Sequence, residues 1–306
     1  MHRWGQVKPL KDRELVEIIR SAFQQADSQE VELLGLHRII GDIESLPPVP
    51  RVYTELCRVT EDPETTSTEE VARVIGRDPA VAAKILQIAN SAFFGQRRQV
   101  ETINRAVILL GLEMVKNLVL ATGVFQALAP TQVQALDQKE FWKHCLACGM
   151  AAATLERGLS KDRQRSELAM LAGTIHDLGK LVLIQYMPER YGDVVSAAQM
   201  QQAMLTDIED EMLGTTHSAV GGYLAEWWNL PARIVEALHW HHEPAESDDV
   251  RLASVVHLAD IVVHRAGIGS SGCGRVPDVD DAATSTLGVG AKTLQKLEKR
   301  MLEAAA

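Results

Sequence analysis

The chain has 306 residues, 46% of them hydrophobic, so it can bury one large core or two ordinary ones. Its formal net charge of −10 and isoelectric point near 5.5 exclude general nucleic-acid binding, because that activity needs a basic surface. It has only four cysteines, no apolar leader, and no run near the roughly 18 apolar residues of a membrane span. We therefore expect a cytoplasmic protein without a membrane segment.

Helical periodicity recurs along the chain and strand signals are nearly absent, which predicts an all-α fold. The first 30 residues resemble a peripheral amphipathic helix, and we assign residues 1–34 to an N-terminal helical extension. Residues 104–125 are apolar nearly all round, which predicts one central buried helix. Cys145 and Cys148 lie one turn apart in a later helical run and are expected to pack as small apolar residues.

Several helix starts can be read from their capping residues. Ser67 and Asp137 each stand three residues before a glutamate, and Asp78 precedes a proline at a first helical position. Thr206 and Glu209 have the same capping-box spacing. These signals predict helices beginning at all four places.

The order of helical runs and loops suggests two packed helical groups, residues 35–128 and 138–266, joined by a connection at 129–137. Together they form one unit over residues 35–266. The segment 267–288 is rich in Gly, Ser and Asp, which predicts a loop before a last charged helix, so that residues 267–306 form a separate C-terminal part.

The stretch LAGTIHDLGKLVL, residues 171–183, places His176, Asp177 and Lys180 inside an apolar segment. Burying a carboxylate or an imidazole without a partner is expensive, so these groups need partners from elsewhere. Taken singly, a histidine on an apolar helix face is usually a core residue satisfied by a neighbour. Several such positions occur in the same half of the chain: His144, His217, His241, His242 and Asp260.

Imidazole nitrogens and carboxylate oxygens are ligands for divalent iron, manganese, zinc and nickel, and the residue types do not distinguish these metals. Adjacent residues on a helix diverge by about 100°, so His176 and Asp177 could reach in two directions, with the carboxylate bridging two ions. Such a pair can activate a water for phosphoryl transfer, and Lys180 could assist with its positive charge. Alternatively, Lys180 is a surface residue favoured by the end of a helix.

His144, His176-Asp177 and Asp260 resemble the H…HD…D signature of the HD phosphohydrolase superfamily. His217 and His241-His242 resemble the further histidines of its HD-GYP branch, which hydrolyses cyclic di-GMP. Residues from about 39 to 266 more closely resemble the HDOD domain, the HD-related output domain of bacterial signalling proteins. The marks of that resemblance are Leu46-Pro47-Pro48, Asp78-Pro79, Leu86 to Ser91, Phe93-Phe94-Gly95 and Leu109-Leu110-Gly111.

The resemblance implies an HD-like helical fold and a signalling role. HDOD domains have generally lost much of the metal set, whereas this chain keeps it, and the glycine-rich GYP segment of HD-GYP enzymes is missing after His242. The first interpretation is therefore a signalling module that binds one or two divalent metals. Its partner would be a signalling protein or a small phosphorylated or nucleotide ligand.

Two alternatives remain open. One is an active metal-dependent phosphodiesterase, assisted by Lys180. The other is a metal-free module in which the polar residues satisfy one another. The resemblance assigns His144, His176, Asp177 and Asp260 to a primary metal site, and Asp177, His217, His241 and His242 to a second. His239, His257 and His264 have weaker claims, with His257 a possible hydrogen-bond partner of the site. The N-terminal helical group is the expected partner surface.

Overall fold

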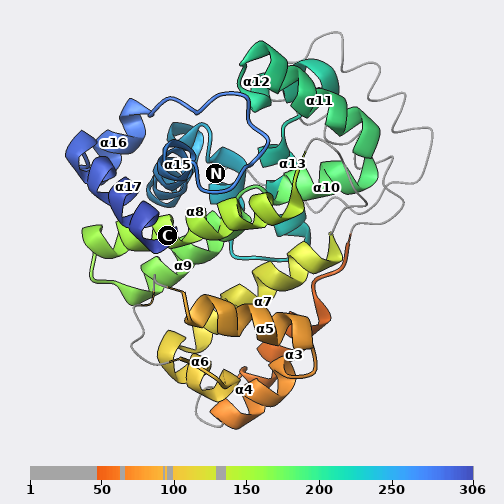
Figure 1. Cartoon of the computed structure of the whole chain (residues 1–306), viewed down its shortest axis with the longest axis vertical. Coiled ribbons are helices and arrows are strands. Elements are labelled where there is room, and N and C mark those ends of the chain that lie inside the picture. Colours follow the sequence, from red (N-terminus) through yellow and green to blue (C-terminus); the bar gives the residue numbers. More distant parts are fainter. Residues whose placement is uncertain (1–46, 63–65, 92–93, 95–98, 129–135, 306) are drawn as a thin grey trace.

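The computed structural model describes residues 47–62, 66–91, 94, 99–128 and 136–305, and these contain helices but no strands, which confirms the all-α fold (Figure 1). The expected extension at 1–34 and the first residues of the first helical group lie outside the described residues. The helices are α3 (Arg51–Val59), α4 (Thr68–Ile75), α5 (Pro79–Ala89), α6 (Ile103–Leu110), α7 (Leu112–Ala127), α8 (Gln138–Leu159), α9 (Arg163–Ile175), α10 (Leu178–Tyr186), α11 (Pro188–Gln201), α12 (Leu205–Leu213), α13 (His217–Trp227), α14 (Ala232–Trp240), the 3-10 turn η2 (Pro244–Glu246), α15 (Val250–Arg265), α16 (Asp281–Leu287) and α17 (Ala291–Ala305).

Two clusters of buried apolar side chains organise these helices. The smaller cluster joins α3 to α6 with the first half of α7, through residues such as Leu56, Ile85 and Leu118. The larger one begins in the second half of α7, at residues such as Val124, and continues to α17. Helix α7 therefore connects the two parts, as Figure 1 shows. The proposed domain boundaries stay a prediction.

The expectation of one continuous helix over 104–125 is wrong. Gly111 separates α6 from α7 with φ of 88° and ψ of 156°, a backbone conformation that residues other than glycine rarely adopt. No single described helix is long and apolar enough to span a membrane, and the one bent pair that qualifies by length and composition, α6 with α7, turns by 116°.

Local signals predicted most of the helix starts correctly. Ser67 accepts a hydrogen bond from the Glu70 amide, and Asp78 and Asp137 cap α5 and α8 in the same way. At the fourth place a helix is present as predicted, but its capping residue is wrong: α12 begins at Leu205, after Met204, without a side-chain cap. The expected loop over 267–288 also contains a helix, α16, because Asp280 caps its first turn.

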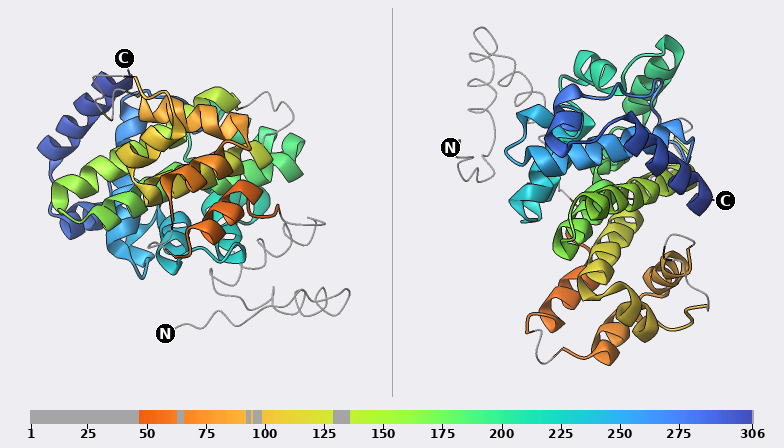
Figure 2. Two further views of the ribbon diagram at one scale, coloured as in Figure 1. Left: turned by 90° about the horizontal axis from the view of Figure 1, so that it is seen from below. Right: turned by 90° about the vertical axis from the view of Figure 1, so that its left-hand side faces the viewer.

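Helix α8 runs through the centre of the larger part and packs against α9 and α15, while α10 packs against α13. The pair α16 and α17 lies against α15 and α8, at the edge of the molecule (Figure 2). Helices α10 and α13 approach very closely at Gly179, where a Cβ atom would lie 1.9 Å from the carbonyl oxygen of His217. This contact holds the start of α10 next to the start of α13.

Candidate metal centre

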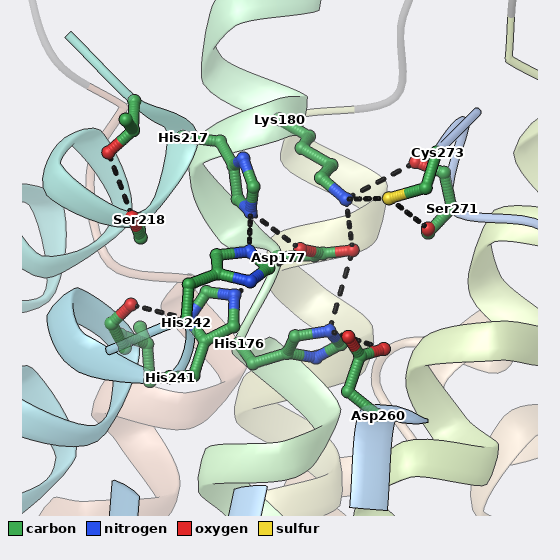
Figure 3. Close-up of polar contacts among 12 residues, drawn as sticks. His176, Asp177, Lys180, His217, Ser218, His241, His242, Asp260, Ser271 and Cys273 are labelled. Carbon is green, nitrogen blue, oxygen red and sulfur yellow. Dashed lines mark hydrogen bonds and ion pairs between the residues drawn. The ribbon is translucent and has the colours of Figure 1, made fainter. Parts of the chain in front are cut away.

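All seven predicted ligands and Lys180 converge in the core of the larger part. Figure 3 shows six of these ligands with Lys180, and His144 lies next to Asp260. Every one of them is buried except His242, which is partly exposed. They come from five places in the fold: His144 from α8, His176 and Asp177 from the turn between α9 and α10 with Lys180 in α10, His217 from the start of α13, His241 and His242 from the end of α14, and Asp260 from α15.

The first cluster of potential ligands lies between α8, α9 and α15. His144 Nε2 is 3.0 Å from Asp260 Oδ1, and His176 Nε2 is 3.5 Å from the same oxygen. Cys148, one turn after His144, places its Sγ 3.4 Å from His144 Nε2. One ligand atom from each of these four residues lies within 4.8 Å of the others, close enough to surround a single ion.

The second cluster consists of His217, His241 and His242, whose ligand atoms also lie within 4.8 Å of one another. Asp177 lies between this cluster and the first. Its Oδ1 is 3.1 Å from His217 Nε2 and 3.9 Å from His241 Nε2, while its Oδ2 is 3.5 Å from His176 Nε2. The carboxylate is therefore placed to bridge two ions.

Hydrogen bonds at the outer nitrogens fix the orientation of three imidazoles. His176 Nδ1 donates to the Gly173 carbonyl at 2.9 Å, and His241 Nδ1 donates to the Leu238 carbonyl at 2.8 Å. His217 Nδ1 donates to Glu209 Oε2 at 2.7 Å. With Nδ1 donating outward, each Nε2 points into the cluster, which is the arrangement that metal-binding histidines adopt.

Two of these inward nitrogens, His176 Nε2 and His241 Nε2, are buried and accept no hydrogen bond from any residue in the described ranges. Such buried polar atoms are rare in native proteins, and a bound water or ion is one of the usual reasons for them. The interpretation in which the polar residues satisfy one another therefore accounts for Asp260 and His144. It leaves His176 Nε2 with carboxylate contacts of 3.5 Å and His241 Nε2 with one of 3.9 Å, none of which is a hydrogen bond.

Lys180 belongs to the site, and the alternative of a surface lysine is wrong. The residue is 1% exposed, and its Nζ donates to Asp177 Oδ2 at 2.8 Å and to the Ser271 carbonyl at 3.3 Å. Cys273 Sγ lies 3.8 Å from the same ammonium group. The loop between α15 and α16 thus closes over the side of Asp177 that faces away from the second cluster (Figure 3).

The electrostatic environment keeps the acids ionised and an imidazole neutral. Burial would raise the pKa of the Asp177 carboxyl, but His176 and Lys180 hold it well below its usual range. Burial opposes the ionisation of Asp260 as well, and its neighbours His264 and His144 keep that pKa low. Burial lowers the pKa of His241 well below its usual value. Ionised carboxylates and neutral imidazoles are the forms that bind metals.

Four site residues escaped the sequence interpretation. The sequence analysis assigns Cys148 a packing role and gives His264 only a weak claim as a ligand. In the structure Cys148 Sγ is 3.4 Å from His144 Nε2, and His264 Nε2 is 3.4 Å from Asp260 Oδ1. Each follows a proposed ligand by four residues on the same helix face. Glu209 and Cys273 carry no local signal, because their roles depend on contacts with α13 and α10. His257 donates to the His241 carbonyl at 2.8 Å, so it supports the backbone of a ligand.

A cavity of about 590 Å³ reaches the second cluster at His242. Trp240 and His239 line it, and its other lining residues include four acids: Asp207, Asp210, Glu243 and Glu246. The described residues lining this cavity contribute no lysine or arginine. The cavity is therefore a negatively charged route from solvent to the second cluster.

Comparisons with known proteins agree with this architecture. An uncharacterised protein of Treponema pallidum is 26% identical over 232 residues, which cover 74% of this chain and 43% of that protein. The chain thus spans less than half the length of this relative. Among solved structures, an HDOD domain protein of unknown function from Geobacter sulfurreducens superposes with a TM-score of 0.69, at 21% identity and 90% coverage of both chains.

Two further structures share the fold. A protein of Marinobacter aquaeolei, provisionally named a signal transduction protein, has a TM-score of 0.67 at 22% identity, covering 91% of this chain and 64% of its own. A protein of Shewanella amazonensis, provisionally named a metal-dependent phosphohydrolase, has a TM-score of 0.60 at 18% identity, with 91% and 99% covered. The HDOD domain family profile matches residues 46–244, most of the chain. This chain belongs to the HDOD domain family.

Proposed function

We propose that this chain is a signalling module that binds one or two divalent metal ions and acts through a partner or ligand rather than through turnover. The observation that carries the metal proposal is the pair of buried nitrogens, His176 Nε2 and His241 Nε2, which lack hydrogen-bond partners among the described residues. Their outer nitrogens are held by backbone carbonyls, so each Nε2 is fixed toward the cluster.

The charge balance of the site also favours a cation. Three carboxylates, Asp177, Asp260 and Glu209, are buried there with a single ammonium group, Lys180. Three negative charges and one ammonium group leave two negative charges, and uncompensated charge in a protein interior is costly. Without metal the imidazoles balance them, since the carboxylates outweigh burial and raise the pKa of His217 and of His264 to about 9. One divalent ion would neutralise that remainder without protonating the imidazoles.

The residues divide naturally between two positions. His144, His176, Asp260 and Cys148 would hold one ion, and His217, His241 and His242 a second, with Asp177 bridging. A bound divalent ion supplies Lewis acidity and lowers the pKa of a coordinated water. Iron, manganese, zinc and nickel all suit imidazole and carboxylate ligands, and the Cys148 sulfur adds a soft donor that suits zinc and iron.

Phosphodiesterase activity is the second candidate, and the cavity that reaches His242 is the observation that favours it. A substrate phosphate entering there would approach Asp207, Asp210, Glu243 and Glu246, and like charges at such a mouth oppose its binding. Lys180 cannot compensate, because it is buried and paired with Asp177. These features favour metal binding without hydrolysis.

Metal binding is tested by titrating metal-free protein with Mn²⁺, Zn²⁺ and Co²⁺ in a calorimeter. Native protein should bind one or two ions, whereas His176→Ala and Asp177→Asn should lose at least one of them. His239→Ala is the matched control, because His239 lines the cavity near His242 without belonging to either ligand cluster. Absence of saturable binding to the native chain would refute the proposal.

Turnover is tested separately with metal-loaded protein, bis(p-nitrophenyl) phosphate and cyclic di-GMP. We expect no hydrolysis above the rate of the Asp177→Asn variant. Hydrolysis that follows enzyme concentration and is lost in that variant would establish the second candidate and remove the non-catalytic part of the proposal.

A further inference from the structure

A second, larger cavity of about 790 Å³ lies between the two parts of the molecule. Its walls come from α5, α7, α8 and α17, which lie near the middle of the molecule's long axis (Figure 1). On α8 it is lined by Trp142, Lys143, Leu146 and Met150, which lie on the helix face opposite His144 and Cys148. The cavity is thus separate from the candidate metal centre, with one helix between them.

The interior of this cavity is mainly apolar and aromatic. Phe125 and Trp142 meet edge to face with ring centroids 4.6 Å apart, and the half-buried side chains of Leu146 and Met150 continue the wall. The hydroxyls of two lining residues, Ser91 and Thr122, are exceptions: both are buried atoms that make no hydrogen bond within the described part of the chain. An unpaired hydroxyl in an apolar wall offers a polar contact to a ligand.

The rim of the cavity carries positive charge in a chain whose net charge is −10. Lys84, Lys139 and Lys143 line it, and the one acidic residue among the described lining, Glu140, is 3.9 Å from Lys143. Lys84 places its Nζ 5.4 Å from the centre of the Trp142 ring, directly beside the apolar wall. Three ammonium groups and one carboxylate leave an excess of positive charge that would attract an anion.

We propose that this cavity binds a small amphipathic organic anion, with its acidic head among the three lysines and its apolar body between Phe125, Trp142 and Leu146. The volume falls within the roughly 300–1,000 Å³ of small-molecule sites. A lining of apolar and aromatic side chains with a few placed polar groups is also what such sites share. This inference is independent of metal binding.

The test is calorimetric titration of the full chain with decanoate, with decan-1-ol and decyltrimethylammonium as neutral and cationic probes of similar length. Decanoate should bind once per chain, at least tenfold more tightly than either other probe. The double variant Lys84→Gln/Lys143→Gln should weaken decanoate binding at least tenfold. Its control is Lys161→Gln/Lys296→Gln, which removes the same charge at exposed lysines outside the cavity.

A second pair of variants tests the location. Ala80 is an exposed lining residue on α5, and Ala83 is an exposed residue of the same helix that does not line the cavity. Ala80→Trp should block decanoate binding, and Ala83→Trp should leave it intact. The proposal is overturned if native protein does not bind decanoate, if the three probes bind equally, or if neither Ala80→Trp nor the lysine variant changes the affinity.

Discussion

At the scale of single residues, Glu209 orients the imidazole of His217, one of the proposed ligands. The carboxylate is fully buried and accepts three hydrogen bonds: from His217 Nδ1 at 2.7 Å, the His217 amide at 2.9 Å and the Tyr191 hydroxyl at 2.5 Å. Such an outer partner fixes the tautomer of a ligand histidine and raises its basicity.

We therefore predict that Glu209→Gln lowers the affinity for the second metal ion about 10- to 100-fold. The glutamine amide is uncharged, and its NH₂ group cannot accept a hydrogen bond where a carboxylate oxygen did. Titration with Co²⁺ measures the change. Tyr191→Phe removes one bond to Glu209 and leaves both bonds to His217, so it should change the affinity by only a few fold. Equal losses in the two variants would show that packing around α12 matters more than the carboxylate.

Lys180 is the other residue with a definable energetic role. Removing one member of a buried ion pair typically costs about 3–5 kcal/mol, because the remaining charge is left without compensation. Lys180→Met should lower the unfolding free energy of metal-free protein by that amount in urea denaturation. Lys116→Met is the control, since its ion pair with Glu113 is partly exposed and should contribute about 1 kcal/mol or less.

Added metal should restore part of the stability of Lys180→Met, because a cation then neutralises Asp177 in place of the ammonium group. If metal-free Lys180→Met were as stable as metal-free native protein, Asp177 would be protonated in the fold, contrary to the low pKa that its neighbours impose.

At the scale of elements, the contact between α10 and α13 sets the distance from Asp177 to His217. A Cβ atom on Gly179 would lie 1.9 Å from the His217 carbonyl oxygen and 2.8 Å from the Gly221 amide nitrogen, both of them backbone atoms that cannot rotate away. Gly179→Ala should therefore separate the helices, cost about 1–3 kcal/mol of stability and weaken metal binding.

Gly158 provides the comparison for this variant. It also lies in a helix, but nothing stands within 4 Å of its Cβ position. Gly158→Ala should raise stability by about 0.5–1 kcal/mol through reduced chain entropy and leave metal binding unchanged. Thermal unfolding together with a Co²⁺ titration measures both effects. Unchanged metal affinity in Gly179→Ala would show that the close helix contact does not position the ligands.

Helix starts that depend on local interactions could be predicted from the sequence. Caps at Ser67, Asp78 and Asp137 are local interactions, so a few residues predict them. The break at Gly111 was missed because the apolar content of residues 104–125 continues on both sides of it, and only the backbone conformation shows the turn. The cap expected at Thr206 failed because Glu209 instead bonds to buried groups on α11 and α13.

Site residues were also predictable where a local pattern marked them and not where their role depends on a long-range contact. Helical spacing and family resemblance pointed to all seven proposed ligands, since each stands out against apolar neighbours. Cys148 and His264 could have been found from their four-residue spacing to His144 and Asp260. The contact between Cys273 and Lys180 spans 93 residues and exists only in the folded chain, so no pattern in the sequence predicts it.

At the scale of the whole molecule, metal binding should stabilise the fold by mass action. A ligand present at 100 times its dissociation constant adds about 2.7 kcal/mol to the free energy of unfolding. For a chain of this size, that corresponds to a rise in melting temperature on the order of 5–10 °C. Removing metal with dipicolinate should lower the melting temperature by this amount in native protein and leave His176→Ala unchanged. An unaffected native protein would indicate that the ligands hold no ion.

The central claim is that this HDOD chain retains a metal-binding core, and metal content of protein purified without added metal or a leaching resin tests it most directly. Inductively coupled plasma mass spectrometry should find one to two equivalents of iron, manganese, zinc or nickel per native chain. His176→Ala and Asp177→Asn should retain much less, and His239→Ala should equal the native protein. Metal-free native protein that also takes up none of these ions on reconstitution would contradict the account, because His176 Nε2 and His241 Nε2 would then be buried without a ligand.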